Sequence, residues 1–531
     1  MNASAAIRRG GLVAAGHPAT AEAGAHILRD GGNAVDAAVA AVCTSFIAEP
    51  VLTGAGGGGF MLLYRNLNDS RLYNGFSRMP HKRIDTLPAP DFRAIPVDFG
   101  DTVQSFHIGQ ASVGTPSLLA MLFRAHGERG RLPIREVLAP AIDAARSGIR
   151  LNELQASFIS LLTPILTDND ACKALHTRDG AMLQQGDTFT NPDLAATLEM
   201  LCHEGIREMY EGDLARAVVN SVSGGGLLSM EDMHGQQSEA HTPLITPLFG
   251  GKLLTNPPPS SGGTLIAFAG MLLEKLHQAF PKQPMQLLLA EALRETSRLR
   301  GGEFDEHVHK PGLAQAFLAT ERVSSSFEVV RQRLEGGGIE TDAEVENRHG
   351  STTHISVVDQ HGMAVSVTTS NGEGSGIVVP GTGIHLNNML GEEDINPMGF
   401  HRLKGGETLS SMMAPSMLIK DGRPVLTLGS GGSNRLRGAI LQVMTRHTLL
   451  QESIEHAVLA PRLHNEGNTL DAEPGALSDE VRHRLLQLGW DIHDWERQSI
   501  YFGGVHAISM DRKGHLHGEG DPRRGGHVAW A

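Results

Sequence analysis

The sequence predicts an α+β fold, and three features lead to that prediction. Apolar residues recur with helical spacing over much of the stretch from Thr20 to Gly301. From Thr352 onward, short β-branched and apolar runs dominate instead. Glycine supplies 63 of the 531 residues, which is typical of a chain with many tight turns and close backbone contacts. Helices first and strands second fit either two domains or one layered domain whose sheets take strands from both halves.

Periodicity and capping residues define the helices of the first half. A helix is expected over 20–30, where Gly31, Gly32 and Asn33 end it and cap a second helix over 34–49. The small residues of that second helix predict close packing against a neighbour. Further helices are expected over 117–128, 133–148, 264–280 and 284–301, and a glycine loop that begins at Gly54 leads into a strand ending near Tyr64.

The second half begins after a polar, charged segment, Arg333–Gly350, which we expect to be exposed and flexible. The strands expected beyond it are 353–359, 364–369, 416–432 and 503–511, with one helix over 434–451 among them.

Composition excludes several classes of protein. The formal net charge of −14 argues against binding to nucleic acid or to an anionic membrane, because no surplus of basic residues exists to neutralise phosphate. The three widely spaced cysteines form no metal-binding or disulfide pattern, so neither a metal nor a disulfide framework is expected. The N-terminus lacks an evident secretory signal, and the most apolar stretch carries two acids and a proline. We therefore expect a cytoplasmic protein without a membrane span.

The stretch "HGSTTHISVVD" from His349 places two threonines at the mouth of a predicted strand. A threonine hydroxyl is a weak nucleophile unless a base is close by. If the bond between Ser351 and Thr352 were cut, the freed α-amine of Thr352 would supply that base, because such an amine titrates at about 8. Paired threonines are also common at strand starts for purely structural reasons. By strand alternation, His354 shares a face with Thr352.

Several short motifs occur in one order along nearly the whole chain. They are "GGNAVDAAVA" (31–40), "GGGGFML" (56–62), "GTPS" (114–117), "PPPSSGG" (257–263), "TTHISVVD" (352–359), "LSSMMAPS" (409–416), "GSGGSNR" (429–435) and "DPRRGG" (521–526). Together they resemble the γ-glutamyltransferase family of N-terminal-nucleophile hydrolases. The resemblance implies a four-layer αββα sandwich and self-cleavage between Ser351 and Thr352. The two subunits, 1–351 and 352–531, would stay together in one fold.

The resemblance also implies roles for individual residues. Thr352 would be the nucleophile, and the family's second hydroxyl would be Ser370, or Thr369 if the alignment contains a gap. Preformed backbone donors stabilise a developing oxyanion, and Gly431 and Gly432 match the family's pair. The residues that match substrate-binding positions are Asn371, Ser410 and Ser411, and no cofactor or metal is implied.

Two stretches depart from the family pattern. The arginine that reads the γ-glutamyl group falls in "NGFSRMPHK", where Arg78 is one place away from the expected position. Met389 replaces an amide or acid, and Glu392 stands where the family has an aspartate. The segment between Asn388 and Ser410 is short, which predicts an open pocket.

These observations leave three functions open. The first is a threonine amidase that cleaves itself and moves the γ-glutamyl group of glutathione or a related amide to water or an amino acceptor. The second is a cephalosporin-acylase-like amidase that acts on glutaryl or other acyl amides. The third is an uncleaved, inactive family member that binds a small anion through Ser410, Ser411 and the glycine loop. A nucleotide-binding function for "GAGGGG" fits poorly, because that loop precedes a strand and no P-loop lysine follows it.

Overall fold

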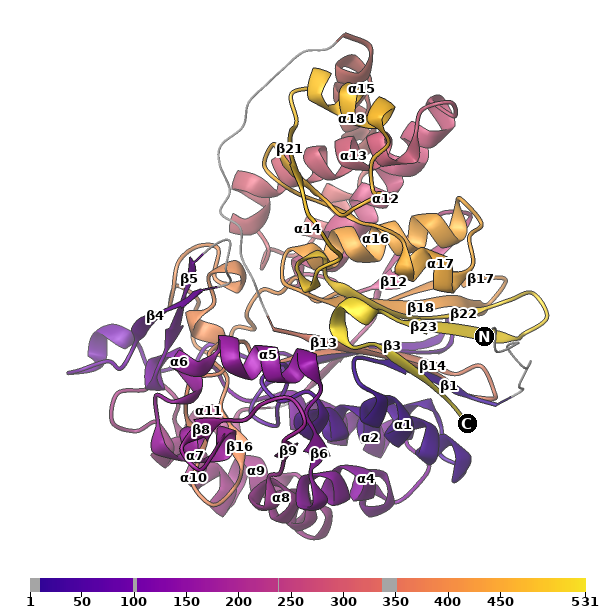
Figure 1. Cartoon of the computed structure of the whole chain (residues 1–531). Coiled ribbons are helices and arrows are strands. Elements are labelled where there is room, and N and C mark those ends of the chain that lie inside the picture. The colour runs from indigo at the N-terminus through magenta and orange to yellow at the C-terminus, as the bar shows by residue number, and fades with distance from the viewer. Residues whose placement is uncertain (1–9, 99–102, 237, 337–350) are drawn as a thin grey trace.

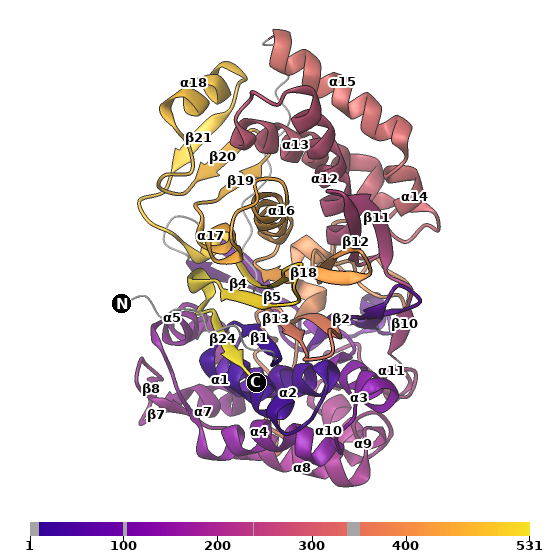
Figure 2. The ribbon, with the colours of Figure 1, turned by 90° about the vertical axis from the view of Figure 1, so that its right-hand side faces the viewer.

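Two β-sheets face each other between two layers of helices (Figures 1 and 2). The computed structural model describes residues 10–98, 103–236, 238–336 and 351–531. The α1, α2 and α4 helices lie on one side of the sheet pair, and α12, α13 and α16 lie on the other (Figure 1). The expected α+β class is confirmed, and the layers follow the order αββα.

The first sheet combines strands from before and after position 351. Its central strands are β14 and β13, which continue into β1 on one side and β2 on the other. Its order and bounds are β10 (Glu239–His241), β3 (Asp69–Gly75), β2 (Gly58–Asn66), β14 (Ala364–Ser370), β13 (Thr353–Val358), β1 (Leu12–Ala15) and β24 (His527–Trp530), all antiparallel to their neighbours.

The second sheet also draws on both halves of the chain. Its order and bounds are β11 (Leu244–Leu248), β12 (Gly251–Thr255), β17 (Ser416–Lys420), β18 (Arg423–Gly431), β22 (Gly504–Met510) and β23 (Leu516–Gly520). Because the two halves share both sheets, they form one layered unit, not two separate domains.

Strand alternation accounts for the layers. In β1, Val13 and Ala15 belong to the apolar core beneath α1 and α2, whereas Leu12 and Ala14 belong to the core between the two sheets. In β18, Leu426 and Leu428 pack into a third core with α12, α13 and α16. Three apolar layers therefore hold four structural layers together.

The helices cover the outer faces of the sheets. Those on the side of the first sheet are α1 (Pro18–Arg29), α2 (Ala34–Ala48), α3 (Leu118–Arg129), α4 (Ile134–Ser147), α5 (Glu153–Leu161), α6 (Thr163–Leu166), α7 (Asp170–His176), α8 (Pro192–Glu204), α9 (Arg207–Glu211), α10 (Asp213–Ser221) and α11 (Met230–His234). Those on the side of the second sheet are α12 (Ser261–Ala279), α13 (Met285–Leu299), α14 (Leu313–Phe317), α15 (Thr320–Gly336), α16 (Arg435–Thr448), α17 (Ile454–Leu459) and α18 (Asp479–Gln487).

Short strand pairs lie outside the two large sheets. They are β4 (Arg93–Asp98) with β5 (Val103–Ile108), β6 (Ile149–Arg150) with β9 (Thr188–Phe189), β7 (Thr177–Arg178) with β8 (Ala181–Met182), β15 (Val378–Val379) with β16 (Ile384–His385), and the trio β19 (Leu463–Glu466), β20 (Thr469–Ala472) and β21 (Asp491–Asp494).

The α2 helix shows why the sequence prediction of its limits was right. The Asn33 side chain accepts hydrogen bonds from the backbone N–H groups of Val35 and Asp36, and the Asp36 carboxylate accepts one from the Asn33 N–H in return. All fifteen residues of α2 are buried, as its small side chains predicted. Its C-terminal neighbour, Glu49, is buried close to the start of β13.

The expected flexible segment at Arg333–Gly350 was partly wrong. Arg333 lies in α15, and its guanidinium pairs with Glu291 and Glu295 of α13. These two carboxylates are fully buried, which is why a sequence that looks polar and exposed is helical there. Residues 337–350 lie outside the described part of the chain.

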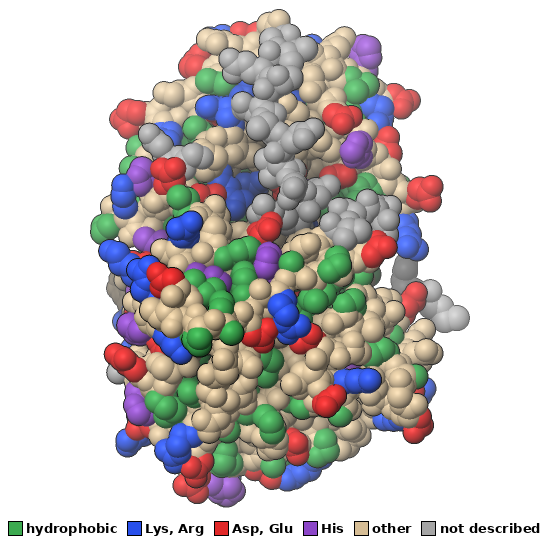
Figure 3. All heavy atoms as spheres, turned by 90° about the vertical axis from the view of Figure 1, so that its left-hand side faces the viewer, with side chains coloured by type: hydrophobic (Ala, Val, Ile, Leu, Met, Phe, Trp, Pro, Cys, Tyr) green, Lys and Arg blue, Asp and Glu red, His purple; other side chains and the backbone are tan. Residues whose placement is uncertain are grey.

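Within the described ranges, no helix is both long enough and apolar enough to cross a membrane. Figure 3 shows acidic and basic side chains interspersed over one face of the molecule. The sequence likewise contains many charged residues of both signs.

Candidate active site

Thr352 lies at the entrance of β13, in the middle of the first sheet. The register pairs Thr353 with Thr369, so the start of β13 lies beside the end of β14. Thr353 points to the helix layer, where its hydroxyl donates to the Glu49 carboxylate. Thr352 therefore takes the opposite face, between the two sheets, and is only 5% exposed.

His354 shares the inner face with Thr352, as expected, and both of its ring nitrogens contact other side chains. Its Nδ1 is 2.8 Å from the Thr368 hydroxyl and its Nε2 is 3.0 Å from the Ser356 hydroxyl. Burial holds the pKa of His354 well below its usual value, with the nearby His506 acting in the same direction. The imidazole is thus a neutral part of the polar core between the sheets.

Three polar side chains hydrogen-bond the residues on either side of the link between Ser351 and Thr352. The Ser370 hydroxyl donates to the Ser351 carbonyl oxygen at 2.5 Å, and an Arg524 guanidinium N–H donates to the Thr352 carbonyl oxygen at 3.2 Å. Glu373 accepts from the Ser351 backbone N–H at 2.9 Å and from its hydroxyl at 2.5 Å. No described residue hydrogen-bonds the Thr352 hydroxyl, so that oxygen is held next to a polarised carbonyl without a competing partner.

The two candidates for the second hydroxyl lie on opposite faces of β14. Ser370 points to the Ser351–Thr352 link and also accepts from the Gly372 N–H at 3.0 Å. Thr369 points to the helix layer, where its hydroxyl is 2.8 Å from that of Thr53. The structure therefore brings Ser370, and not Thr369, to Thr352.

Glycines allow the backbone to close around these groups. A Cβ atom at Gly57 would lie 2.3 Å from the Ser370 carbonyl oxygen, so the glycine loop before β2 supports the end of β14. Gly431 ends β18 and packs directly on the Thr352 carbonyl oxygen. Gly432 follows with a φ of 119°, a conformation that favours glycine, and lies against the Arg524 guanidinium.

A cavity of about 40 Å³ adjoins Thr352. It has room for a few water molecules but not for a peptide-sized ligand. Its lining residues include Ser351, Thr352, Ser370, Met389, Glu392 and Ser411. The expectation of an open pocket is thus wrong for the uncut chain, because Ser351 itself occupies part of the wall.

Ser410 and Ser411 lie on the side of the site that faces the second sheet, where both hydrogen-bond the start of α12. The Ser410 hydroxyl is 2.9 Å from that of Ser261, and the Ser411 carbonyl accepts from the Ser261 N–H at 2.8 Å. The Ser411 hydroxyl accepts from the Met413 N–H at 3.0 Å and borders the cavity. Ser410 is buried as well but does not line the cavity.

Two expected substrate-binding residues do not reach the cavity. The Arg78 guanidinium pairs with Glu239 of β10 at 2.6 Å, at the edge of the first sheet. Asn371 follows Ser370 and therefore points the other way, where its amide donates to the His385 carbonyl at 3.2 Å and packs against Gly54. Neither side chain lines the space next to Thr352, so their roles in substrate binding stay predictions.

Carboxylates dominate the electrostatics of the site. Glu373, Glu392 and Asp394 lie together near Thr352, with the buried Arg524 close by. Burial raises the pKa of Glu373, and burial together with the charges of Glu373 and Asp394 raises that of Glu392 well above its usual value. Burial also lowers the pKa of Arg524 to about 10. Among the described residues, no group of three or more His, Cys, Asp or Glu side chains is arranged to hold a metal ion.

Sequence reasoning missed Glu373 and Arg524. Glu373 is an acid within the glycine-rich turn "NGEGSG" that directly follows a strand, which was a usable signal. Arg524 lies in "DPRRGG", a motif that was noted without assigning a role to its arginines. The strands that bring position 524 to position 352 are far apart in the sequence, so only the fold shows the contact.

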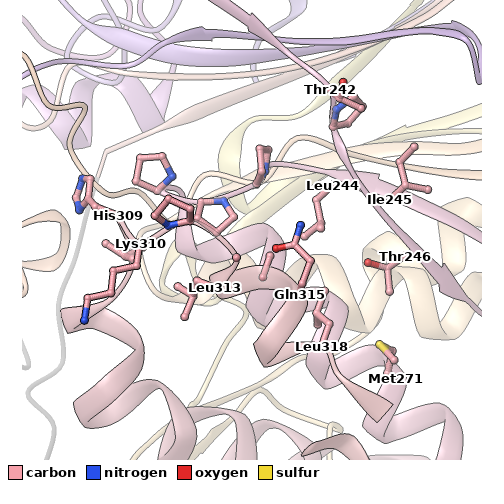
Figure 4. A pocket seen from close by; sticks show the side chains of 18 of the residues that line it. Thr242, Leu244, Ile245, Thr246, Met271, His309, Lys310, Leu313, Gln315 and Leu318 are labelled. Atoms are coloured by element: carbon pink, nitrogen blue, oxygen red, sulfur yellow. The ribbon is translucent and has the colours of Figure 1, made fainter. Parts of the chain in front are cut away.

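A much larger cavity lies elsewhere. It has a volume of about 880 Å³ and lies between β11 and α14, with Leu244, His309, Lys310 and Leu313 among its lining residues (Figure 4). It includes neither Thr352 nor any other residue predicted for the site. Choosing the site by cavity volume alone would therefore miss Thr352 and the polar groups around it.

The four layers, with a hydroxyl at the entrance of an inner strand, are the fold of N-terminal-nucleophile hydrolases. The family model described as gamma-glutamyltranspeptidase matches residues 20–531, and the chain belongs to that family.

Similar proteins include a glutathione hydrolase and an acylase. The glutathione hydrolase proenzyme of Bacillus subtilis (strain 168) is 29% identical over 545 residues, covering 98% of this chain and 91% of the relative. The Acylase ACY 1 proenzyme of Pseudomonas sp. (strain V22) is 31% identical over 527 residues, covering 96% and 91%. The crystal structure of cephalosporin acylase from Bacillus halodurans matches with a TM-score of 0.83 at 23% identity, covering 100% of this chain and 97% of that one. This last likeness concerns the fold alone.

Proposed function

We propose that the chain cuts itself between Ser351 and Thr352 and then acts as a threonine amidase on γ-glutamyl amides such as glutathione. The observation that carries this proposal is the arrangement at the link. The Thr352 hydroxyl has no partner among the described residues, while Ser370 donates a hydrogen bond to the neighbouring Ser351 carbonyl. This carbonyl is the group that the hydroxyl would attack, and its polarisation favours that attack.

After the cut, Thr352 would carry both the nucleophile and the base. Its freed α-amine would take the proton from its own hydroxyl as that oxygen attacks the amide of a substrate. The acyl group would then rest on Thr352 as an ester, and water or an amino acceptor would remove it. Ser370 would orient the hydroxyl and the amine, and the backbone N–H groups of Gly431 and Gly432 would stabilise the oxyanion. Ser370 already contacts Ser351, and Gly431 packs on the Thr352 carbonyl, which supports these roles.

The acidic side of the cavity supports a γ-glutamyl donor over a glutaryl donor. These two acyl groups differ by the α-ammonium, which only the γ-glutamyl group has. Glu392 borders the cavity, and burial, together with repulsion from the neighbouring carboxylates, raises its pKa. An ammonium placed next to it would relieve that repulsion, whereas an uncharged methylene would not.

Another observation favours the acylase alternative. Arg78 pairs with Glu239 and does not line the cavity, so the described residues place no arginine from the "NGFSRMP" stretch where a substrate α-carboxylate would lie. Met389 adds an apolar surface to the wall. Among the other acyl amides of that alternative, a donor whose acyl chain has no terminal carboxylate would fit such a wall better.

Competing substrates separate these functions. Purified protein is assayed with γ-glutamyl-p-nitroanilide and with glutaryl-p-nitroanilide at equal concentrations. The proposal expects kcat/KM to favour the γ-glutamyl compound, and a preference for the glutaryl compound would support the acylase instead. If intact mass spectrometry gives one full-length mass and neither compound is turned over, the protein is an inactive member that binds a small anion.

A further inference from the structure

Glu373 hydrogen-bonds both the backbone and the side chain of Ser351. One carboxylate oxygen accepts from the Ser351 backbone N–H at 2.9 Å and the other accepts from its hydroxyl at 2.5 Å. Both residues are buried, Ser351 at 4% and Glu373 at 2% exposure. Hydrogen bonds to a buried carboxylate are stronger than those between neutral groups, so this pair fixes the serine firmly.

The turn that carries Glu373 is itself held in place. Its N–H donates to the Asn388 side-chain oxygen at 2.9 Å and to Glu392 at 3.2 Å. The Gly374 N–H donates to the same Asn388 oxygen at 3.1 Å. Gly372 and Gly374 both have positive φ, which lets the turn bring the carboxylate back over the end of β14.

Three hydrogen bonds thus fix Ser351 from two sides. Glu373 holds its N–H and hydroxyl, and Ser370 holds its carbonyl oxygen. These bonds set the plane of the scissile peptide relative to Thr352. An intramolecular attack depends on such alignment, because a small misplacement of the reacting atoms costs a large factor in rate.

We propose that Glu373 is the positioning residue for self-cleavage, and that it acts by holding Ser351 so that the Ser351 carbonyl faces the Thr352 hydroxyl. This inference rests on the proposed function. Glu373 neither attacks nor takes the proton in this step. It lies opposite Arg524, Glu392 and Asp394, the charged groups that face it from the surrounding segments.

The step balances without a further reactant apart from water. The Thr352 oxygen bonds to the Ser351 carbonyl carbon, the bond from that carbon to the Thr352 nitrogen breaks, and the hydroxyl proton passes to the departing nitrogen. Water then opens the ester, which restores the hydroxyl and leaves a carboxylate on Ser351. The amine takes up the proton released by that carboxylic acid.

The product carries a charge that its surroundings oppose. The new Ser351 carboxylate would lie against Glu373 and near Glu392 and Asp394. Like charges on neighbouring groups in a buried site repel strongly. The contact that holds the uncut serine therefore favours its departure after the cut, which would free the space next to Thr352 for substrate.

A time course of cleavage tests the role of Glu373. The full-length precursor is made by cell-free translation, and its conversion into two chains is followed by gel and intact mass. We expect Glu373→Gln to slow conversion by about tenfold or more, because an amide cannot accept both bonds. Glu373→Asp keeps the charge but shortens the side chain by one methylene, so we expect conversion of this variant to be slow as well. A wild-type rate in the Asp variant would mean that charge alone matters and would overturn the positioning role.

A double-mutant cycle tells positioning of Ser351 from a general structural effect. Ser351→Ala removes the hydroxyl bond only, so the effect of Glu373→Gln should shrink severalfold in the Ser351→Ala background. Equal effects in both backgrounds would contradict the proposal. Glu519→Gln is the matched control, because burial also raises the pKa of Glu519, yet it has no contact with Ser351; its conversion rate should equal that of the wild type. Melting temperatures report whether each variant folds.

The Thr352→Ala variant separates the two proposals. If it still converts into two chains, the proposed function fails and the role of Glu373 fails with it. If it stays uncut while Glu373→Gln converts at the wild-type rate, only the role of Glu373 is wrong.

Discussion

Gly431 packs so closely on Thr352 that a Cβ atom at position 431 would lie 2.2 Å from the Thr352 carbonyl oxygen. The two residues belong to different sheets, since Gly431 ends β18 and Thr352 precedes β13. Their contact is where the two sheets meet at the candidate active site. No side chain larger than hydrogen fits there unless one of the two backbones moves.

Replacement of Gly431 by alanine should therefore damage the site. We expect Gly431→Ala to slow self-cleavage at least tenfold and to lower stability by about 1–3 kcal/mol, since backbone atoms must shift to admit the methyl group. Cleavage is followed by gel and stability by thermal unfolding. Gly127→Ala is the control, because a Cβ atom at Gly127 meets nothing within 4 Å. Wild-type behaviour of Gly431→Ala would show that the close contact is not required.

The faces of β14 predict different effects for two adjacent hydroxyls. Ser370→Ala removes the hydrogen bond to the Ser351 carbonyl, so cleavage should slow by about ten- to a hundredfold. Thr369→Val keeps the shape of the side chain and loses only the bond to Thr53, so cleavage should stay within about threefold of the wild type. Intact mass spectrometry over time measures both. A larger effect at position 369 than at 370 would reverse the assignment.

The small cavity predicts that the uncut chain cannot bind substrate. In the Thr352→Ala variant, which we expect to remain uncut, Ser351 still occupies the wall of a space of about 40 Å³. Isothermal titration with glutathione should therefore detect no binding, although the variant keeps every other residue of the cavity. Binding of glutathione to this uncut variant would contradict the view that cleavage opens the site.

Glu49 predicts a pH dependence of stability. Burial raises its pKa to about 7, despite hydrogen bonds from Thr353 and Thr20 and the nearby charge of Arg524. Between about 4.5 and 7 the folded chain therefore holds a proton that the unfolded chain has lost, so this group lowers stability as the pH rises through that window. The full loss is on the order of 3 kcal/mol, and it stays constant at higher pH.

The variant Glu49→Gln removes that titration. We expect its melting temperature, relative to that of the otherwise identical parent, to rise as the pH increases from 4.5 to 7. Both proteins carry Thr352→Ala, so that cleavage does not differ between them. A melting-temperature difference that does not change with pH would mean that Glu49 is ionised throughout.

Local patterns were sufficient for much of the fold. The limits of α2 followed from Asn33, whose capping bonds involve residues at most three positions away. Thr352 stood out because a hydroxyl at the start of a strand, preceded by Gly350 and Ser351, is visible in a few consecutive letters. The likeness to the family followed from the order of short motifs along the chain.

Other features depended on contacts between distant parts of the chain. Arg78 and Asn371 were assigned by their places in motifs, but a shift of one residue in a strand or turn sends a side chain to the opposite face. Arg333 looked like part of an exposed linker until its partners, Glu291 and Glu295, were known. Sequence spacing does not reveal which face a side chain takes at the end of a strand.

By itself, the sequence determined the α+β class and the helices and strands near the site, and it singled out Thr352 for the proposed cleavage. These follow from propensity, capping and short-range order, which act between near neighbours. Only the tertiary structure decided that Ser370 and not Thr369 meets the Ser351–Thr352 link, and that Glu373 contacts Ser351 while Arg524 contacts Thr352. The physical reason is that these contacts join different strands and turns of two facing sheets, so their geometry exists only once the sheets have packed together.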